Sequence, residues 1–292
     1  TNYVIDRHYP EVKDAPYPYL KLLEEVMDRH ALLVAQWMHV GFIHGVMNTD
    51  NMAITGETID YGPCAFMDTF NHTKVFSSID HMGRYAYGNQ PAIVQWNIAR
   101  FAETILQLLD KIQDRAVDFA KEVIEAYPER FREYWLSGMR KKLGLFTSES
   151  EDEALIQSLL DIMQDNEADF TLTFRGLCDT ALSQENKGTL RHLFKDARAY
   201  DKWDTNWRDR LSHEVKAPEE RVELMHQANP AVIPRNHRIE QAINAAVERE
   251  DYSPFEKLLE VLSSPYEEQN ELSEYMLPPK PEEHVLQTFC GT

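Results

Sequence analysis

Two polar residues, Asn51 and Asp60, lie on either side of a short sequence that is typical of a tight chain reversal. The stretches Met52 to Ile54 and Thr58 to Asp60 resemble short strands, and Thr55-Gly56 between them predicts a two-residue turn. Antiparallel pairing across this turn would place Asn51 opposite Asp60, with Cα atoms about 4.5 to 5.5 Å apart. Amide and carboxylate oxygens suit Mg²⁺, which completes its coordination with water and substrate phosphates. The segment is therefore predicted to hold a metal–nucleotide complex.

Two motifs of protein kinases surround these residues, and they occur in the kinase order. Asp60-Tyr61-Gly62 is similar to the Asp-Phe-Gly triplet, whose Asp holds Mg²⁺ on the nucleotide phosphates. Upstream, His44 to Asn51 has the eight-residue length of the kinase catalytic loop. The third residue of that loop is the catalytic Asp in kinases, but here it is Val46, which cannot accept a proton. The nearest carboxylate is Asp50, which becomes the expected base for an acceptor hydroxyl.

The stretch HGVMNTDNMAITGETIDYGP, with LVAQWMHVGF before it, resembles the central motif of the selenoprotein O (YdiU) family. Further blocks that match this family are GRYAYGNQPAIVQWN, MRKKLGL, NPAVIPRNHRIEQAI and the closing TFCGT, so the resemblance spans almost the whole chain. It implies a kinase-like protein adenylyltransferase that binds ATP in a flipped orientation and transfers AMP to Ser, Thr or Tyr hydroxyls of proteins. It also implies that Asp50 is the catalytic base, that Asn51 and Asp60 bind Mg²⁺ or Mn²⁺, and that Asp60 contacts the metal-bound nucleotide.

The motifs of a nucleotide-gripping lobe are missing from the sequence. It contains no Gly-x-Gly-x-x-Gly loop, no Val-Ala-Ile-Lys strand and no Walker motif. The resemblance therefore implies that this chain corresponds to the C-terminal portion of longer family members, and we expect it to fold but to transfer nothing alone. The alternatives are a protein uridylyltransferase, an ordinary γ-phosphate kinase, which Val46 disfavours, and a catalytically dead pseudokinase scaffold, which retention of Asp50, Asn51 and Asp60 disfavours.

Apolar residues recur at helical spacing through most of the chain. Helices are predicted for Tyr19 to Val40, Pro91 to about Ala120, Glu129 to Leu143, Asp152 to Met163, Ala168 to Ala181, Leu190 to Ala197, Trp203 to Leu211, Ala217 to Gln227, Arg235 to Arg249 and Pro254 to Leu262. We expect a mostly α protein. Residues 1–145 would form a protein-kinase-like C-terminal lobe with one small β-hairpin, and residues 146–292 a C-terminal helical extension with an irregular tail. Within a long loop at 70–90, Tyr85 and Tyr87 are either acceptor-docking residues or core anchors.

Composition restricts the partners. The formal charge of −19 repels phosphate backbones, which argues against nucleic acid, and no apolar run approaches the ~20 residues that cross a bilayer. Three widely spaced cysteines indicate a reducing compartment: the cytoplasm if the protein is bacterial, or mitochondria if it is eukaryotic. Some family members pair a C-terminal Cys or selenocysteine with a loop Cys, so the resemblance leaves open a bond between Cys290 and Cys64. The oligomeric state also remains open.

Overall fold

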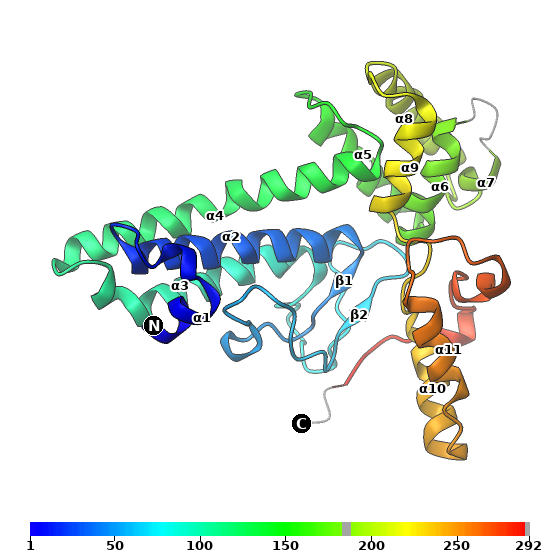
Figure 1. Cartoon of the computed structure of the whole chain (residues 1–292). Helices are drawn as coiled ribbons and strands as arrows, with labels where there is room; N and C mark the ends of the chain where they lie inside the picture. Colours follow the sequence, from blue (N-terminus) through cyan, green and yellow to red (C-terminus); the bar gives the residue numbers. More distant parts are fainter. Residues whose placement is uncertain (183–187, 290–292) are drawn as a thin grey trace.

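The computed structural model describes residues 1–182 and 188–289, which form a mostly helical protein, as predicted (Figure 1). The α-helices are α1 (Asn2–His8), α2 (Pro18–His39), α3 (Gln90–Leu109), α4 (Gln113–Lys142), α5 (Asp152–Asn166), α6 (Phe170–Leu182), α7 (Gly188–Arg191), α8 (Ala197–Leu211), α9 (Pro218–Ala228), α10 (Asn236–Arg249) and α11 (Ser253–Leu262). The 3₁₀ turns are η1 (Pro10–Val12), η2 (Thr49–Asn51), η3 (Tyr87–Asn89), η4 (Asn270–Tyr275) and η5 (Pro281–Glu283).

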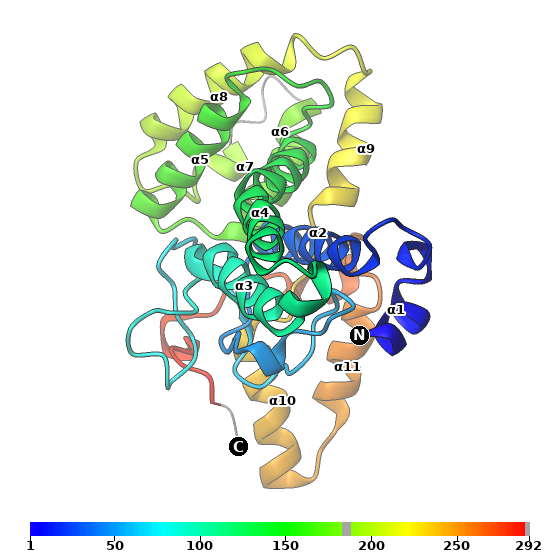
Figure 2. The ribbon, with the colours of Figure 1, turned by 90° about the vertical axis from the view of Figure 1, so that its left-hand side faces the viewer.

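Helices α2, α3 and α4 pack together and form the layer that supports the predicted site (Figures 1 and 2). Helix α2 starts with Pro18 in its first turn, where the missing N–H of proline costs no hydrogen bond. Its apolar residues, including Leu22, Leu23, Val26 and Val34, form one buried stripe. Beyond its end, Gly41 has φ +72°, and a Cβ there would lie 3.1 Å from the Phe170 ring. Glycine therefore lets the chain turn from α2 against the start of α6.

The predicted helix boundaries between residues 91 and 143 are wrong. The chain breaks at 110–112, where the Asp110 carboxylate accepts a hydrogen bond from the Ile112 amide, and not near Ala120. Helix α4 then continues to Lys142 and includes Pro128. The predicted helix Leu190 to Ala197 is also wrong, because only the short α7 and the first residue of α8 lie near it. Local capping and packing, not apolar periodicity, set these ends.

The single small β element of the described residues lies beside the predicted hairpin, not within it. Strands β1 (Phe42–Ile43) and β2 (Ala65–Phe66) pair antiparallel, with Phe42 opposite Phe66. The Phe42 and Phe66 rings are 5.3 Å apart, and the Trp37 ring lies equally close to Phe42. This aromatic group anchors the ribbon to the C-terminal end of α2.

Helices α5 to α9 continue the core that begins in the first helices. One cluster of buried apolar side chains runs from Ile5 to Met225, and a second, small cluster contains Ala231, Val232 and Val261 beneath α10 and α11. The first cluster crosses residue 145, so the division into 1–145 and 146–292 stays a prediction. None of the helices in the described part of the chain has the length and apolarity to span a bilayer.

Arg235 connects three distant segments through a buried ion-pair network. Its guanidinium donates to the Asp68 carboxylate at 2.7 Å, to Asp169 at 2.6 and 3.2 Å, and to the Met276 carbonyl at 3.1 Å. Only 1% of Arg235 is exposed. Burial raises the pKa of Asp169, and the Arg235 charge opposes that shift. The network thus holds the segment after β2, the start of α6 and the C-terminal region together.

Replacing Arg235 by methionine is expected to lower the free energy of unfolding by about 3–5 kcal/mol, because the buried Asp169 and the partly buried Asp68 carboxylates lose their counter-charge. Urea denaturation followed by circular dichroism measures the change. Arg198→Met is the control, since Arg198 is highly exposed and its contact with Asp196 is 3.5 Å long; it should change stability by less than about 1 kcal/mol. Equal losses in both variants would contradict the structural role of the network.

Candidate active site

The residues predicted to carry chemistry lie in segment 44–62, which we call the site loop. It leaves β1, forms the turn η2, approaches α2 and returns toward β2. Figure 1 shows it below α2, with α4 above that helix. The short ribbon β1–β2 closes the base of the loop, so residues far from each other in the loop lie on neighbouring stretches of chain.

The predicted hairpin register is wrong by one residue. The observed bridge joins Met52 to Thr58, so Asn51 does not face Asp60 directly. The turn is formed by the Gly56 amide, which donates to the Ala53 carbonyl at 3.0 Å, and not by a two-residue connection. Gly56 has φ +76°, and a Cβ there would lie 2.7 Å from Cβ of Arg29. Contact of the loop tip with α2 therefore sets the register.

The stretch from Val46 to Asn51 orients the first pair of candidate residues. The Asn51 side-chain amide donates to the Val46 carbonyl at 3.0 Å, which directs the amide nitrogen inward and leaves its oxygen available as a ligand. Asp50 lies in η2 and is exposed. Within the described part of the chain, no hydrogen bond or ion pair engages its carboxylate, so Asp50 is free to act on an acceptor. Val46 contributes to the site through its backbone carbonyl, which orients Asn51.

His44 joins the two halves of the site loop. Its Nε2 donates to the Ile59 carbonyl at 2.8 Å, while Nδ1 accepts from the Val46 amide at 3.4 Å. The residue is 1% exposed, and its ring lies 5.4 Å from that of Trp37. Burial lowers the pKa of His44, although the hydrogen bond to Ile59 and the nearby Asp60 charge oppose that shift. The imidazole is thus a neutral structural bridge.

Asp60 is held at the surface in a conformation that few residues adopt. Its φ of +54° places it in the left-handed region, where Asp is tolerated better than most side chains. Immediately before it, Thr58 accepts a hydrogen bond from the Trp37 indole at 2.8 Å, and Ile59 is bound by His44. The Asp60 carboxylate is exposed and makes no hydrogen bond or ion pair with any described residue. The backbone around Asp60 is fixed while its carboxylate stays free.

Three polar residues outside the motifs also support the site loop, and sequence reasoning missed their role. Gln90 accepts from the His44 amide and donates to the Phe42 carbonyl, both at 3.0 Å. Asn97 donates to the Met47 carbonyl at 2.9 Å. Tyr85 donates to the Asn48 side chain at 2.6 Å. Of the three, Asn97 is a polar residue on the largely apolar face of the helix predicted from Pro91, whereas Tyr85 and Gln90 fall in the predicted loop 70–90, which gives no such signal.

Tyr85 and Tyr87 are core anchors, which resolves the alternative left by the sequence. Tyr85 is 8% and Tyr87 3% exposed. The Tyr87 hydroxyl donates to the Met38 carbonyl at 2.6 Å, beside the end of α2. Neither ring is available to dock an acceptor.

The donor set fits a hard divalent cation that is shared with a phosphate ligand. Asn51 supplies an amide oxygen and Asp60 a carboxylate, which are ligands typical of Mg²⁺. Across the described residues, no group of three or more His, Cys, Asp or Glu side chains forms a metal cage. Such a cage is unnecessary where substrate phosphates and water complete the coordination. Asn51 and Asp60 as ligands remain a prediction.

The C-terminal tail reaches the end of the site loop. Thr288 pairs with Ser77 in a parallel bridge, and its hydroxyl donates to the Pro63 carbonyl. Cys64 is a partly buried free thiol, and burial raises its pKa to about 11. Cys290 lies outside the described residues, so its pairing with Cys64 stays open.

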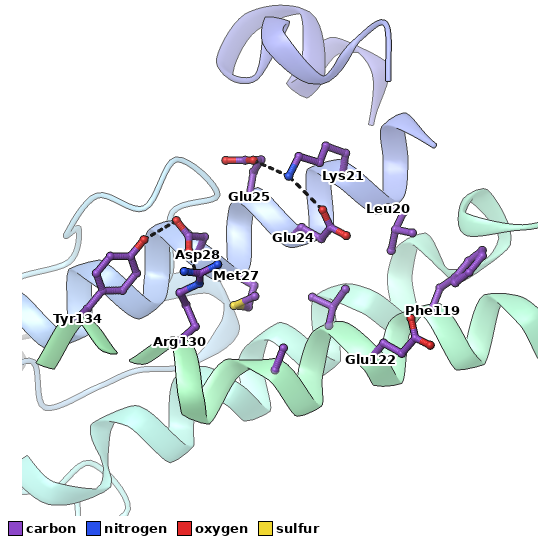
Figure 3. A pocket seen from close by; sticks show the side chains of 12 residues that line it. Leu20, Lys21, Glu24, Glu25, Met27, Asp28, Phe119, Glu122, Arg130 and Tyr134 are labelled. Atoms are coloured by element: carbon purple, nitrogen blue, oxygen red, sulfur yellow. Dashed lines mark hydrogen bonds and ion pairs between the residues drawn. The ribbon is translucent and has the colours of Figure 1, made fainter. Parts of the chain in front are cut away.

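A cavity of about 400 Å³ between α2 and α4 is separate from the site loop (Figure 3). Its charged side chains largely pair with each other: Lys21 with Glu24 and Glu25, and Arg130 with Asp28. The Tyr134 hydroxyl also donates to Asp28 at 2.8 Å. No residue of segment 44–62 lines this cavity, so it adds no group to the candidate site.

Comparison with known proteins identifies the family. The model for protein adenylyltransferase SelO matches residues 1–263, and the chain belongs to this family. Among curated relatives, "Protein nucleotidyltransferase YdiU" of Rhizobium rhizogenes is 58% identical over 291 residues. Relatives of the same name from Rhizobium meliloti and Rhodopseudomonas palustris are 56% and 54% identical. The three matches cover 100% of this chain but 58–59% of the relatives, so the chain spans less than two thirds of their length.

We expect His44→Leu to lower the free energy of unfolding by about 1–3 kcal/mol, because the Ile59 carbonyl and Val46 amide lose their partner. Hydrogen exchange at the Val46 amide should accelerate by the factor that this free-energy loss implies, which is about tenfold for each 1.4 kcal/mol. His213→Leu is the control, because His213 is exposed and, among the described residues, its ring hydrogen-bonds only to the Glu149 carboxylate. Unchanged exchange at Val46 would refute the bridging role of His44.

The same imidazole predicts a pH dependence. Its pKa is lowered in the folded state, whereas an unfolded His titrates near ~6.5, so the unfolded chain binds the proton first as pH falls. Stability should therefore decline below about pH 6.5, and His44→Leu should reduce that decline. Urea titrations of both proteins between pH 7.5 and pH 5 measure the difference; parallel curves would contradict the prediction.

Proposed function

We propose that this chain is the catalytic-loop portion of a protein adenylyltransferase, which transfers AMP from ATP to Ser, Thr or Tyr hydroxyls of proteins. The observation that carries the proposal is the arrangement around His44, which holds the Asp50–Asn51 turn and the Asp60 segment in one loop. Membership of the SelO adenylyltransferase family supports the same reaction. The kinase-like character of residues 1–145 is part of this proposal, as is the assignment of the helical extension to 146–292.

In the proposed reaction, the acceptor hydroxyl oxygen attacks the α-phosphorus of ATP. A bond forms between these atoms, the bond from the α-phosphorus to the bridging oxygen breaks, and pyrophosphate leaves. Asp50 orients the hydroxyl and takes its proton, a role that suits its exposed carboxylate, which no described residue engages. Val46, at the position of the kinase base, has no group that could do this. The base is thereby displaced by four residues along the chain.

Asn51 and Asp60 would hold Mg²⁺ or Mn²⁺ against the triphosphate. A bound divalent cation would neutralise the charge that develops on the phosphate oxygens. The Val46 carbonyl orients Asn51 by accepting its amide hydrogen. The left-handed backbone at Asp60 turns the chain just after the segment that Trp37 and His44 hold. Positioning of these two residues is what the site loop contributes to catalysis.

Labelled nucleotides test the proposal with the full-length protein. Label from α-phosphate ATP should remain on protein acceptors, and label from γ-phosphate ATP should not. Asp50→Asn should slow transfer by about 10²- to 10⁴-fold with little change in ATP affinity, because only proton removal is affected. Asp60→Asn should weaken metal–ATP binding itself, measured by isothermal titration calorimetry with Mg²⁺ or Mn²⁺.

Asp118→Asn is the matched control, because Asp118 is an exposed carboxylate on α4, outside the site loop. It should leave both transfer and ATP affinity unchanged. Transfer of the γ-label from ATP to the acceptor would establish a kinase. Transfer of the α-label from UTP in preference to ATP would establish a uridylyltransferase, and transfer of no label at all would establish a pseudokinase. The 292-residue chain alone should bind metal–ATP weakly and transfer no AMP.

A further inference from the structure

Two arginine side chains lie over the exposed indole ring of Trp96, beside the site loop. Trp96 of α3 is 42% exposed. The guanidinium carbon of Arg84 lies 4.9 Å from its ring centroid, and that of Arg100 lies 5.3 Å from it. In a chain with a formal charge of −19, two guanidinium groups over one exposed ring place positive charge at this surface. We call Arg84, Trp96 and Arg100 the acceptor surface.

Both cations are available to an incoming anion. The Arg84 guanidinium forms no ion pair with a described residue, although the Arg84 backbone amide donates to the Asp80 carboxylate at 2.8 Å. Arg100 pairs with Glu103 at 2.8 Å, but both side chains are exposed, and such pairs contribute little free energy. Both guanidinium groups lie over the same exposed ring, so a carboxylate that approaches the Trp96 edge would be attracted by both charges. Because the Arg100–Glu103 pair is solvent-exposed and weak, a ligand carboxylate can replace Glu103 at Arg100.

The acceptor surface is connected directly to the residues proposed for catalysis. Arg100 and Thr49 line one cavity of about 310 Å³, and Thr49 precedes Asp50. On the other side, Tyr85 follows Arg84 and donates to Asn48 of the site loop at 2.6 Å. The remaining cavity lining is largely apolar, and its members include Met52, Ile54, Ile98 and Phe101. A segment that places its hydroxyl at Asp50 would thus reach both an apolar cavity and two cations.

We propose that the acceptor protein binds here through an acidic segment, with Asp or Glu side chains that pair with Arg84 and Arg100 and an apolar side chain in the 310 Å³ cavity. The proposal rests on the proposed adenylyl transfer and adds the chemistry of its acceptor. Met82, which is 92% exposed two residues before Arg84, offers further apolar contact at the edge. Charge decides between an acidic and a basic acceptor, because a basic segment would place like charges against both guanidinium groups.

Peptide acceptors test this with the full-length protein. One series carries a single Tyr, Ser or Thr with Glu placed in turn at each flanking position, and a matched series carries Lys there. Glu should lower the KM for the peptide by about tenfold relative to Lys at the favoured positions, with kcat little changed, and added salt should reduce the difference. The double variant Arg84→Gln/Arg100→Gln should remove this preference: the KM for Glu peptides should rise about tenfold, while the KM for Lys peptides should not rise.

Arg115→Gln is the matched control, because Arg115 lies on α4, outside the acceptor surface. Its guanidinium carbon is 5.8 Å from the centroid of the partly exposed Phe119 ring, and it pairs with Asp110. It should retain the Glu preference. No Glu preference in the wild type, or one that survives the double variant, overturns the proposal. A rise in the KM for ATP instead of the peptide would also overturn it, by assigning the arginines to the nucleotide.

Binding separates this proposal from the proposed function. Fluorescence anisotropy of labelled Glu and Lys peptides measures docking without any transfer. If no AMP is transferred but Glu peptides bind about tenfold more tightly in an Arg84- and Arg100-dependent way, the acceptor surface stands and the adenylyl transfer falls. If AMP is transferred but peptide affinity does not depend on these arginines, the adenylyl transfer stands and the acceptor surface falls.

Discussion

The geometry of the candidate site depends on one neutral imidazole. His44 must accept a hydrogen bond at Nδ1 and donate one at Nε2, and only a single neutral tautomer can do both. Burial against Trp37 favours that uncharged form. The consequence reaches both ends of the site loop, because the Val46 carbonyl next orients Asn51 and the Ile59 peptide precedes Asp60. A protonated ring would lose the bond to the Val46 amide.

The sequence was sufficient for the helices with long apolar stripes and for the identity of the candidate residues, but not for their register. Helix α2 begins and ends within one residue of its prediction because the apolar period and Gly41 are local signals. The pairing of Met52 with Thr58 depends on contact between Gly56 and Arg29, which lie far apart in sequence. Such tertiary contacts, like the buried pair Arg235–Asp169, have no periodic signature.

The C-terminal region contacts the segments at the base of the site loop. Asn236 donates to the Phe66 carbonyl in β2 at 2.9 Å, beside the Arg235 network that holds Asp68. Thr288 contacts Pro63 on the other side of β2. The ribbon that closes the site loop is therefore held by residues about 170 and 225 positions away in sequence. This explains why two strands of only two residues each persist, since a ribbon this short has little stability of its own.

The two proposed substrates, ATP and an acidic acceptor, need different counter-charges at the site loop. The exposed carboxylates of Asp50 and Asp60, in a chain of formal charge −19, repel a free triphosphate, so the nucleotide is favoured only together with a divalent cation. An acidic acceptor faces the same repulsion at Asp50 and needs its own counter-charge. The guanidinium groups of Arg84 and Arg100 supply this counter-charge, whereas a metal ion supplies it for the nucleotide. Separate cations for the nucleotide and the acceptor allow each to bind without displacing the other, which a transfer between two anionic partners requires.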